Sequence, residues 1–394
     1  MPTYLLVALT AYDLAGLALG AVLLWRPFGR GGGAPPWWRD ALAFLALGAA
    51  LCAAAVVVAG AFLPHGRFAV LRLLTHGLFC VAAPLLVVRG AWRIRKSAPA
   101  LGGALLAAGL SLDAAFVYAL EVEPRWLAVT RYELASGRLE PGAPPIRVAV
   151  LADLQTDHVG DYERRVFREL DALRADLVLL PGDYLQLPYA DPRVRERERL
   201  ALVELFAGLE HRPRYGIFAV DGDADSAEET LAGSAARPLV DEELILPGDP
   251  PLQLIGLGRP TSRYPLAAER VASIERFPGL TIVMGHAPDF ALAEIEAFEE
   301  RGPGAVTLPA LFVAGHTHGG QVVIPGWGPP ITLTHVPRRY ASGLHSLGAL
   351  TLFVSRGVGL ERGMAPRVRF NCRPELASIT VRGLEPSERG VGRD

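Results

Sequence analysis

Four long apolar blocks fill the first third of the chain and constrain its fold more than any other feature. They span residues 4–25, 41–63, 69–88 and 101–119. Each is close to the roughly 20 residues that an α-helix needs to cross a bilayer. The second block carries no charge, whereas the third contains Arg72 and His76. The pattern predicts an all-α membrane domain of about four transmembrane helices over residues 1–120.

The composition supports a membrane domain and excludes some functions. Of the 394 residues, 51% are apolar or aromatic, and the mean hydropathy of +0.28 is high for a purely soluble enzyme. The formal net charge of −2 predicts no nucleic-acid partner, because such a partner needs a basic patch. The cysteines Cys52, Cys80 and Cys372 lie far apart, so we expect neither a disulfide framework nor a cysteine metal site.

The basic residues between the blocks predict the orientation of the membrane domain. Most of them lie in the first and third loops, namely Arg26, Arg30, Arg39, Arg89, Arg93, Arg95 and Lys96. Because basic loops stay in the cytoplasm, both termini should face outward. The first block is not a typical cleavable signal peptide, since it lacks a basic start and contains Asp13. With Arg, Ala and Gly as abundant as in GC-rich bacteria, we predict a multi-pass bacterial inner-membrane protein whose C-terminal domain is extracytoplasmic.

Titratable residues within the apolar blocks leave three interpretations open. They are Asp13, Arg72, His76 and Asp113. An unpaired charge at such a depth is costly, so each needs a partner or a function. The set indicates a path for a lipid headgroup or substrate, or an Asp–Arg pair that holds the helices together, or side chains near the helix ends that snorkel to the interface.

After a connector rich in proline and glycine, residues 121–145 with one strand at 128–134, the pattern changes. From residue 146, short apolar strands alternate with amphipathic helices, which predicts an α/β domain over residues 146–383. The predicted strands are 146–151, 177–180, 215–220, 280–284, 308–313, 350–354 and 376–381. The predicted helices are 162–173, 193–209 and 288–300. The polar residues 384–394 are expected to form a disordered tail.

Five of these strands end in loops that carry carboxylates or histidines. The residues are Asp153, Asp183, Asp223, Asp225, His286, His316 and His318. Ligands of open α/β sheets collect at the C-terminal ends of strands, where loops from separate strands meet. Imidazole and carboxylate groups are common ligands of divalent ions. The pattern therefore predicts a metal centre.

The histidine pair lies in Ala314-Gly315-His316-Thr317-His318-Gly319-Gly320-Gln321, directly after an apolar strand. The glycines permit a sharp turn. Two imidazoles one residue apart can reach two different ions, or one ion from two sides. A histidine pair alone is weak evidence, but the preceding strand and the glycines strengthen it.

The order of these motifs resembles that of the calcineurin-like metallophosphoesterases. Their pattern runs Asp-x-His, Gly-Asp, Gly-Asn-His-Asp/Glu, Gly-His and Gly-His-x-His. Here the same order reads Asp153-Leu154-Gln155, Gly182-Asp183, Gly222-Asp223-Ala224-Asp225, Gly285-His286 and Gly315-His316-Thr317-His318. The chain looks like the membrane-anchored bacterial branch that carries Gly-His-Thr-His-Gly-Gly-Gln. The resemblance implies an α/β (α+β, four-layer) sandwich of two mixed β-sheets flanked by helices.

The resemblance also implies a site for two divalent metal ions. Its ligands would be Asp183 as the bridge, Asp153, Gln155 and His318 for one ion, and Asp223, His286 and His316 for the other. Two cations roughly 3.5–4 Å apart clamp a phosphoryl group and acidify a bridging water. Mixed oxygen and nitrogen ligands suit Mn, Fe or Zn better than Ca or Mg, and we expect Mn.

Three positions depart from the family pattern. Gln155 replaces a histidine ligand, although its amide oxygen can still coordinate an ion. Asp223 replaces asparagine, which adds a carboxylate and should strengthen metal binding while weakening the attraction for a phosphate. Ala224 replaces the catalytic histidine, whose general-acid help is worth about 10²–10⁴-fold. A good leaving group would tolerate that loss. Asp225, His158 or an arginine could also substitute for the histidine, and His158 and Asp225 are the candidate catalytic residues.

Other interpretations of single residues remain open. His158 could equally be a solvated loop histidine. Arg356 and Arg362 could bind a substrate phosphate or form surface ion pairs. We predict a metallophosphoesterase that hydrolyses a phosphate ester or pyrophosphate, with a lipid-linked substrate suggested only by the membrane domain. The alternative is a metal-binding sensor or scaffold domain that has lost catalysis.

Overall fold

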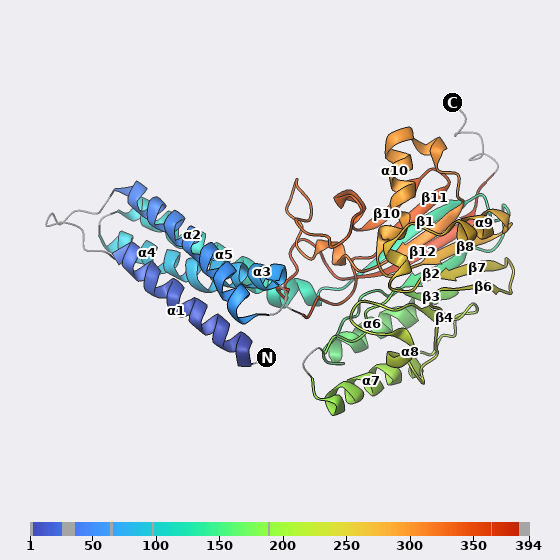
Figure 1. Cartoon of the computed structure of the whole chain (residues 1–394), viewed down its shortest axis with the longest axis horizontal. Coiled ribbons are helices and arrows are strands. Elements are labelled where there is room, and N and C mark those ends of the chain that lie inside the picture. Colours follow the sequence, from blue (N-terminus) through green and yellow to red (C-terminus); the bar gives the residue numbers. More distant parts are fainter. Residues whose placement is uncertain are drawn as a thin grey trace. The chain divides into compact units, whose positions relative to one another are not determined.

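The computed structural model describes residues 3–25, 36–63, 66–96, 98–187, 190–363 and 365–385. They form two compact units (Figure 1). The helical unit consists of Met1–Val122 with Glu361–Arg367, and the sheet unit of Glu123–Leu360 with Val368–Asp394. Arg26, Arg30 and the predicted tail from residue 386 onward lie outside the described residues.

The helical unit contains four long apolar helical segments. The first two are α1 (Thr3–Trp25) and α2 (Trp37–Phe62). The third joins α3 (Gly66–His76), the π-helical Gly77–Ala82 and α4 (Ala83–Arg95), and the fourth joins α5 (Pro99–Val117) to the π-helical Tyr118–Val122. All four are long and apolar enough to cross a membrane. They confirm the predicted helical domain and fit a membrane anchor.

Small residues bring α4 and α5 into close contact. A Cβ at Gly90 would lie 2.6 Å from the backbone nitrogen of Leu106. One at Gly102 would lie 2.7 Å from the carbonyl oxygen of Gly90. Glycine at both positions therefore lets the two backbones touch, as in the tight helix pairs of membrane proteins.

The charged residues of the helical unit form other pairs than the Asp–Arg pair that the sequence suggested. Asp13 binds His76, with 2.8 Å between Oδ1 and Nε2, and not an arginine. An Asp–Arg contact does exist, but it joins Asp40 of α2 to Arg89 and Arg93 of α4, at 2.7 and 2.8 Å. The prediction that these two arginines lie in a loop is wrong. A carboxylate on the neighbouring helix lets α4 continue through them, because it compensates their charge.

Two six-stranded sheets run through the described part of the sheet unit. The first has the order β1 (Ala128–Ser136), β12 (Glu375–Gly383), β2 (Ile146–Val150), β3 (Leu177–Leu180), β4 (Ile217–Ala219) and β5 (Ala236–Pro238). The second has the order β10 (Gly343–Leu347), β11 (Leu350–Val354), β9 (Ala310–Ala314), β8 (Leu280–Met284), β7 (Leu252–Gly256) and β6 (Glu242–Leu246). Both sheets are mixed, because β12–β2, β10–β11 and β6–β7 are antiparallel pairs among parallel ones.

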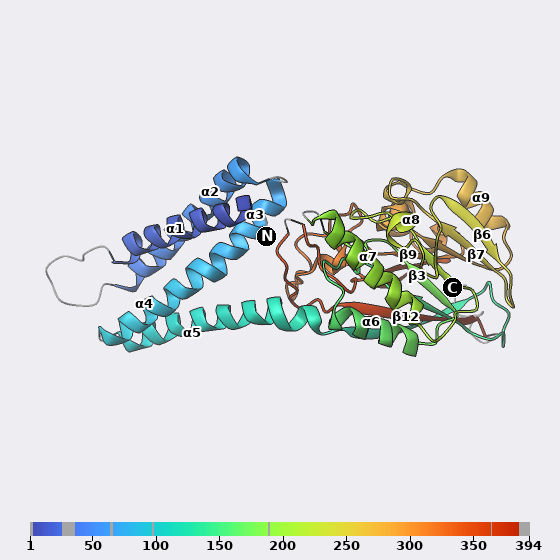
Figure 2. The same ribbon diagram turned by 90° about the horizontal axis from the view of Figure 1, so that it is seen from below.

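Helices cover the outer faces of the two sheets. On the first sheet lie α6 (Asp161–Ala172), α7 (Pro192–Ala207) and the short α8 (Ala227–Thr230), as Figures 1 and 2 show. The second sheet is covered by α9 (Ala268–Arg276) and α10 (Leu292–Arg301). Three apolar cores separate these layers, one under each pair of helices and one between the sheets. The four-layer α/β architecture confirms the predicted fold class.

Side chains that alternate between the two faces of each strand explain these cores. In β2 the side chains of Val148 and Val150 enter the core between the sheets, whereas Ala149 enters the core under α6 and α7. Successive side chains of a strand point to opposite faces, so a strand buried on both sides is apolar throughout. This is why the central strands were visible as short apolar runs.

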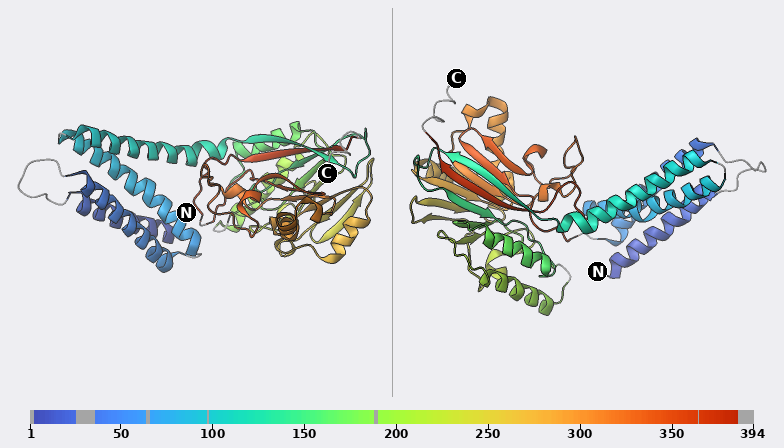
Figure 3. Two further views of the ribbon diagram at one scale, coloured as in Figure 1. Left: turned by 90° about the horizontal axis from the view of Figure 1, so that it is seen from above. Right: turned by 180° about the vertical axis from the view of Figure 1, so that it is seen from behind.

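The strand expected at 128–134 is β1, and it pairs in parallel with β12, so that Ala128 faces Glu375. Figure 3 shows the cyan β1 beside the red β12, although almost the whole sheet unit separates them in sequence. The predicted connector therefore contributes a strand to the first sheet. The strands β5, β6, β7 and β10 were not predicted. β6 begins with Glu242 and Glu243, which hides the apolar pattern that marks a buried strand.

Candidate metal centre

The candidate ligands follow parallel strands of both sheets. Asp153, Asp183 and Asp223 come after β2, β3 and β4 of the first sheet. His286 and His316 come after β8 and β9 of the second. The C-terminal ends of parallel strands meet at one edge of a sheet, so the two sheets bring their loops to a common place.

The structure brings these five side chains together in two overlapping groups. One contains Asp223, His286 and His316, and the other contains Asp153, Asp183 and His286. Within each group the potential ligand atoms lie within 4.8 Å of one another. All are buried except Asp223. His286 belongs to both groups, which makes it the centre of the cluster.

Strained backbone marks the ligand loops. Five of the seven predicted ligands have a positive φ, which non-glycine residues rarely adopt: Asp153 (49°), Gln155 (37°), Asp183 (59°), His316 (69°) and His318 (49°). Such conformations cost roughly 1–3 kcal/mol each and cluster at functional sites. We infer that the loops are shaped for the positions of these side chains and not for local stability.

Two glycines make room for the carboxylates. A Cβ at Gly222 would collide with the Asp183 carboxylate, and one at Gly315 would lie 2.7 Å from Oδ2 of Asp153. The backbone then holds both groups in place. Asp183 accepts a hydrogen bond from the Ala224 N–H at 2.8 Å, and Asp153 accepts one from the His316 N–H at 2.9 Å.

Backbone carbonyls determine which imidazole nitrogens carry the protons. His286 Nδ1 lies 2.8 Å from the Pro181 carbonyl oxygen, and His316 Nε2 lies 3.0 Å from that of Leu333. A carbonyl oxygen only accepts, so each of these nitrogens must donate a hydrogen. Nε2 of neutral His286 and Nδ1 of neutral His316 therefore present lone pairs, as metal-binding histidines do.

These lone pairs point at each other and at carboxylates. His286 Nε2 lies 3.2 Å from His316 Nδ1 and 3.5 Å from Asp183 Oδ2. His316 Nδ1 lies 3.2 Å from Asp223 Oδ2. Four electron-rich atoms in contact repel unless a proton or a cation lies among them. The donor set, two nitrogens and two oxygens, fits a divalent transition metal.

The pKa values of the most buried groups show that it is unfavourable to bury charges so close together. Burial, together with the neighbouring Asp183 carboxylate, raises the pKa of Asp153 well above its usual value. Burial also lowers the pKa of His286, although Asp183 works in the other direction. A neutral imidazole next to crowded carboxylates is a suitable partner for a metal ion.

Asp223 and His316 shift each other's pKa values in opposite directions. Burial works to raise the pKa of Asp223, but His316, His286 and Arg263 hold it below its usual range. Burial works to lower the pKa of His316, but the Asp223 carboxylate keeps it raised. Asp223 is thus the charged, half-exposed edge of the cluster.

Gln155 and His318 are placed differently from the other five residues. Both are buried, and the Gln155 backbone N–H donates to the Asp183 carbonyl at 2.9 Å. His318 belongs to neither ligand group; its Nδ1 lies 3.4 Å from the buried guanidinium of Arg369. The assignment of these two residues as metal ligands stays a prediction.

The two predicted catalytic residues have structural contacts. The side chain of His158 is 70% exposed, and its Nδ1 lies 3.2 Å from the Glu198 carboxylate on α7. The Asp225 carboxylate accepts the backbone N–H groups of Tyr184 and Leu185, at 3.0 and 2.8 Å. Burial raises the pKa of Asp225 to about 7, even though both hydrogen bonds lower it. Asp225 thus holds the chain just after Asp183, and the catalytic role of both residues stays a prediction.

Sequence reasoning missed a cation at the edge of the cluster. Arg263, in the turn Thr261–Arg263 after β7, binds the Asp223 carboxylate, with 2.5 Å between Nη2 and Oδ2. The strand before it, β7, was not predicted, so the sequence did not place its loop beside the other ligand loops. Of the two arginines considered from the sequence, Arg356 and Arg362, Arg356 pairs with Glu375 at 3.1 Å.

Asp289 holds the loop that contacts His316. Its buried carboxylate accepts the Thr334 hydroxyl at 2.6 Å and the His335 N–H at 2.8 Å. These residues directly follow Leu333, whose carbonyl binds His316. The spacing His286-Ala287-Pro288-Asp289 could have indicated this role, because the same loop carries a ligand and its support.

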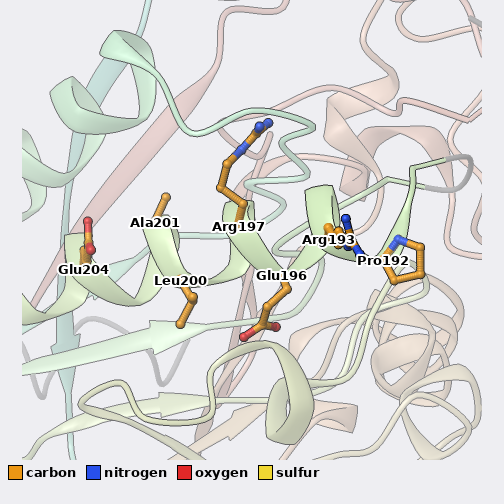
Figure 4. A pocket seen from close by; sticks show the side chains of 7 residues that line it. All are labelled: Pro192, Arg193, Glu196, Arg197, Leu200, Ala201 and Glu204. Carbon is orange, nitrogen blue, oxygen red and sulfur yellow. The ribbon is translucent and has the colours of Figure 1, made fainter.

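A depression of about 710 Å³ elsewhere on the sheet unit contains none of these residues. Figure 4 shows that its lining side chains all come from α7, among them Arg193, Glu196 and Arg197. Nothing in its lining resembles a ligand set. The chemistry lies with the buried cluster and not with this surface.

Comparison with known proteins agrees with the fold and the cluster. No family model matches the chain. Phosphodiesterase YaeI of Escherichia coli (strain K12) is 27% identical over 294 residues, covering 70% of this chain and 96% of YaeI. The uncharacterized metallophosphoesterase YkuE of Bacillus subtilis (strain 168) is 24% identical over 302 residues, covering 71% and 94%.

These similarities support the metallophosphoesterase superfamily. They also support a hydrolase that acts on phosphoester bonds and that binds divalent metal.

Proposed function

We propose that the chain is a membrane-anchored enzyme that hydrolyses a phosphate ester or pyrophosphate at a centre of two divalent ions, with Mn favoured. The observation that carries this proposal is the convergence of His286 Nε2, His316 Nδ1 and carboxylate oxygens within 3.2–3.5 Å. The apolar helices suggest a lipid-linked substrate, on the extracytoplasmic side of a bacterial inner membrane.

In this proposal the five clustered residues hold the ions, together with Gln155 and His318. When bound, two divalent ions would neutralise the phosphoryl charge and acidify the attacking water. The backbone N–H of Ala224 keeps the Asp183 carboxylate in its orientation. The carbonyls of Pro181 and Leu333 keep the two imidazoles in the required tautomers.

Arg263 takes part of the role that a histidine at position 224 would have. Its guanidinium lies at the half-exposed edge of the cluster, against Asp223. A planar guanidinium can donate two hydrogen bonds to a phosphoryl group. It would stabilise negative charge on the phosphoryl oxygens but would not protonate the leaving group, because a guanidinium keeps its proton in proteins. Good leaving groups should therefore react best.

Hydrolysis of bis-p-nitrophenyl phosphate by the purified full chain with Mn²⁺ tests the proposal. Wild type should release nitrophenol, and Asp183→Asn should reduce the rate to background. The fully exposed Asp161 provides the matched control, since Asp161→Asn should leave the rate unchanged. Absence of metal-dependent turnover on this ester and on a nucleotide pyrophosphate would refute the enzyme.

A sensor or scaffold domain is the second candidate function, because Ala224 offers no side chain for acid catalysis. It predicts bound metal without turnover. Metal analysis of the full chain beside the same rate measurement separates the two functions.

A further inference from the structure

Exposed apolar side chains gather on one loop of the sheet unit. Nine large hydrophobic residues are exposed in the described part of that unit, and five belong to residues 322–333 or to Phe370. We call these five the apolar loop surface: Ile324, Trp327, Ile331, Leu333 and Phe370. Trp327, at 56% exposure, lies in the tight turn that the Ile324 N–H and Gly328 carbonyl close. Grouped exposed apolar residues mark a surface that contacts another apolar phase.

This surface borders the metal centre. The carbonyl of Leu333 binds His316, so the loop backbone touches a candidate ligand directly. Phe370 joins the loop through its backbone, because its carbonyl accepts the Val323 N–H and its N–H donates to Gln321, both at 2.9 Å. Gln321 ends the histidine motif, so the surface and the centre share one stretch of backbone.

The same surface is connected to the point where the chain leaves its last apolar helix. That span runs from Pro99 to Arg125, so the exposed Trp126 directly follows it. Arg373 stacks 4.3 Å from the Trp126 ring and lies two residues after Asn371, whose amide donates to the Val323 carbonyl at 3.4 Å. Glu123 receives the Asn371 N–H at 2.8 Å. These hydrogen bonds join the loop to Glu123, the first residue of the sheet unit.

The aromatic and basic residues here have the chemistry of a membrane interface. The guanidinium of Arg373 lies over the ring of Trp126. The guanidinium of Arg338 lies over the ring of Trp327, 4.5 Å from its centroid. Tryptophan prefers the headgroup level of a bilayer, and arginine there meets lipid phosphates. A protein partner would not require this pairing at both places, whereas a lipid surface favours it.

We propose that the apolar loop surface inserts into the lipid bilayer and presents the metal centre to a phosphoester carried by a membrane lipid. The insertion stands on the exposed side chains and their connection to Trp126. The lipid phosphoester rests on the proposed function.

Insertion is measurable without any activity. A Trp327→Cys variant in a Cys52→Ser, Cys80→Ser background is labelled with an environment-sensitive fluorophore; the buried Cys372 is left in place. In nanodiscs, brominated phosphatidylcholine should quench the label at least about twofold, whereas Leu200→Cys on α7 should show no quenching. No quenching at position 327, or crosslinking there to a second copy or another protein instead, overturns the proposal.

The lipid substrate has a separate readout. The ratio of turnover of a bilayer-embedded lipid phosphodiester to turnover of bis-p-nitrophenyl phosphate should fall at least about tenfold in Trp327→Ser. Ile245→Ser, on the exposed face of β6, should leave the ratio unchanged. Quenching with an unchanged ratio in Trp327→Ser would refute the lipid substrate and keep the insertion. Absence of turnover on both substrates in wild type would refute the proposed function and the lipid substrate with it, whereas the quenching result alone decides the insertion.

Discussion

Single residues decide how this site departs from the family pattern that the sequence resembles. Ala224 contributes a backbone N–H, and no imidazole, beside Asp183. Asp223 adds a negative charge, and Arg263 compensates it at 2.5 Å. Asp223 and Arg263 belong together, because the arginine would have no carboxylate to bind here if position 223 were asparagine.

Arg263→Ala should lower kcat/KM for bis-p-nitrophenyl phosphate about 10- to 100-fold, since a hydrogen bond to a charged group is worth about 1.5–3 kcal/mol. Binding of inorganic phosphate should weaken by a similar factor, and titration calorimetry measures that without turnover. Arg263→Lys should recover part of both, because it keeps the charge but not the bidentate geometry.

His158→Ala is the comparison for this prediction. His158 is exposed and pairs with Glu198, so the change should leave kcat within about threefold, in contrast to the 10²–10⁴-fold of a lost general acid. If His158→Ala reduces kcat strongly and Arg263→Ala does not, then His158 has the catalytic role predicted from the sequence. The role that the structure suggests for Arg263 is then wrong.

At the scale of elements, α7 holds the loop that follows the first ligand motif. Its buried Glu198 accepts the Val159 N–H at 2.8 Å and also contacts His158 and Arg197. Burial works to raise the pKa of Glu198, but these three partners hold it below its usual value. One carboxylate thus joins a helix to a site loop.

Glu198 should make the sheet unit sensitive to acid. A carboxyl group with a lowered folded-state pKa stabilises the fold above its unfolded pKa, and that stability is lost as the pH falls through the folded value. The melting temperature of the full chain in detergent should therefore drop below about pH 4.5. Glu198→Gln should flatten this dependence and cost about 1–2 kcal/mol at neutral pH. An equal acid slope in both proteins would contradict the role.

At the scale of the whole molecule, the centre links both sheets, because its ligands come from the ends of β2, β3 and β4 and from those of β8 and β9. A metal ion that binds only the folded state stabilises it by about 2.7 kcal/mol at a hundredfold excess over Kd. The packing of the two sheets should therefore depend on the metal.

Mn²⁺ should raise the melting temperature of the sheet unit by about 5–10 °C over that of the chelator-treated protein. Scanning calorimetry of the full chain in detergent measures the shift. Asp183→Asn should lose most of it, whereas Arg263→Ala should retain it, because Arg263 is not a ligand. A melting temperature that does not respond to Mn²⁺, Fe²⁺ or Zn²⁺ would refute the metal centre.

Much of the fold was predictable because its determinants are local. Strands β3, β8 and β11 have the predicted limits, since a strand buried on both faces is a continuous apolar run. The four apolar helices were visible for a similar reason. In contrast, the edge strand β6 begins with Glu242 and Glu243, which conceal its strand pattern. Its partner β7 carries no charge but was not predicted either, and Arg263 in the turn after it was missed with it.

The sequence alone determined which residue types follow which strands, because turn glycines, apolar runs and ligand side chains are local features of a chain. It did not determine which partner each charge finds. Only the tertiary structure decided that Arg263 faces Asp223, that His158 faces Glu198, and that Asp40 binds two arginines. These pairs join residues 40 or more positions apart, and such contacts depend on how helices and sheets pack.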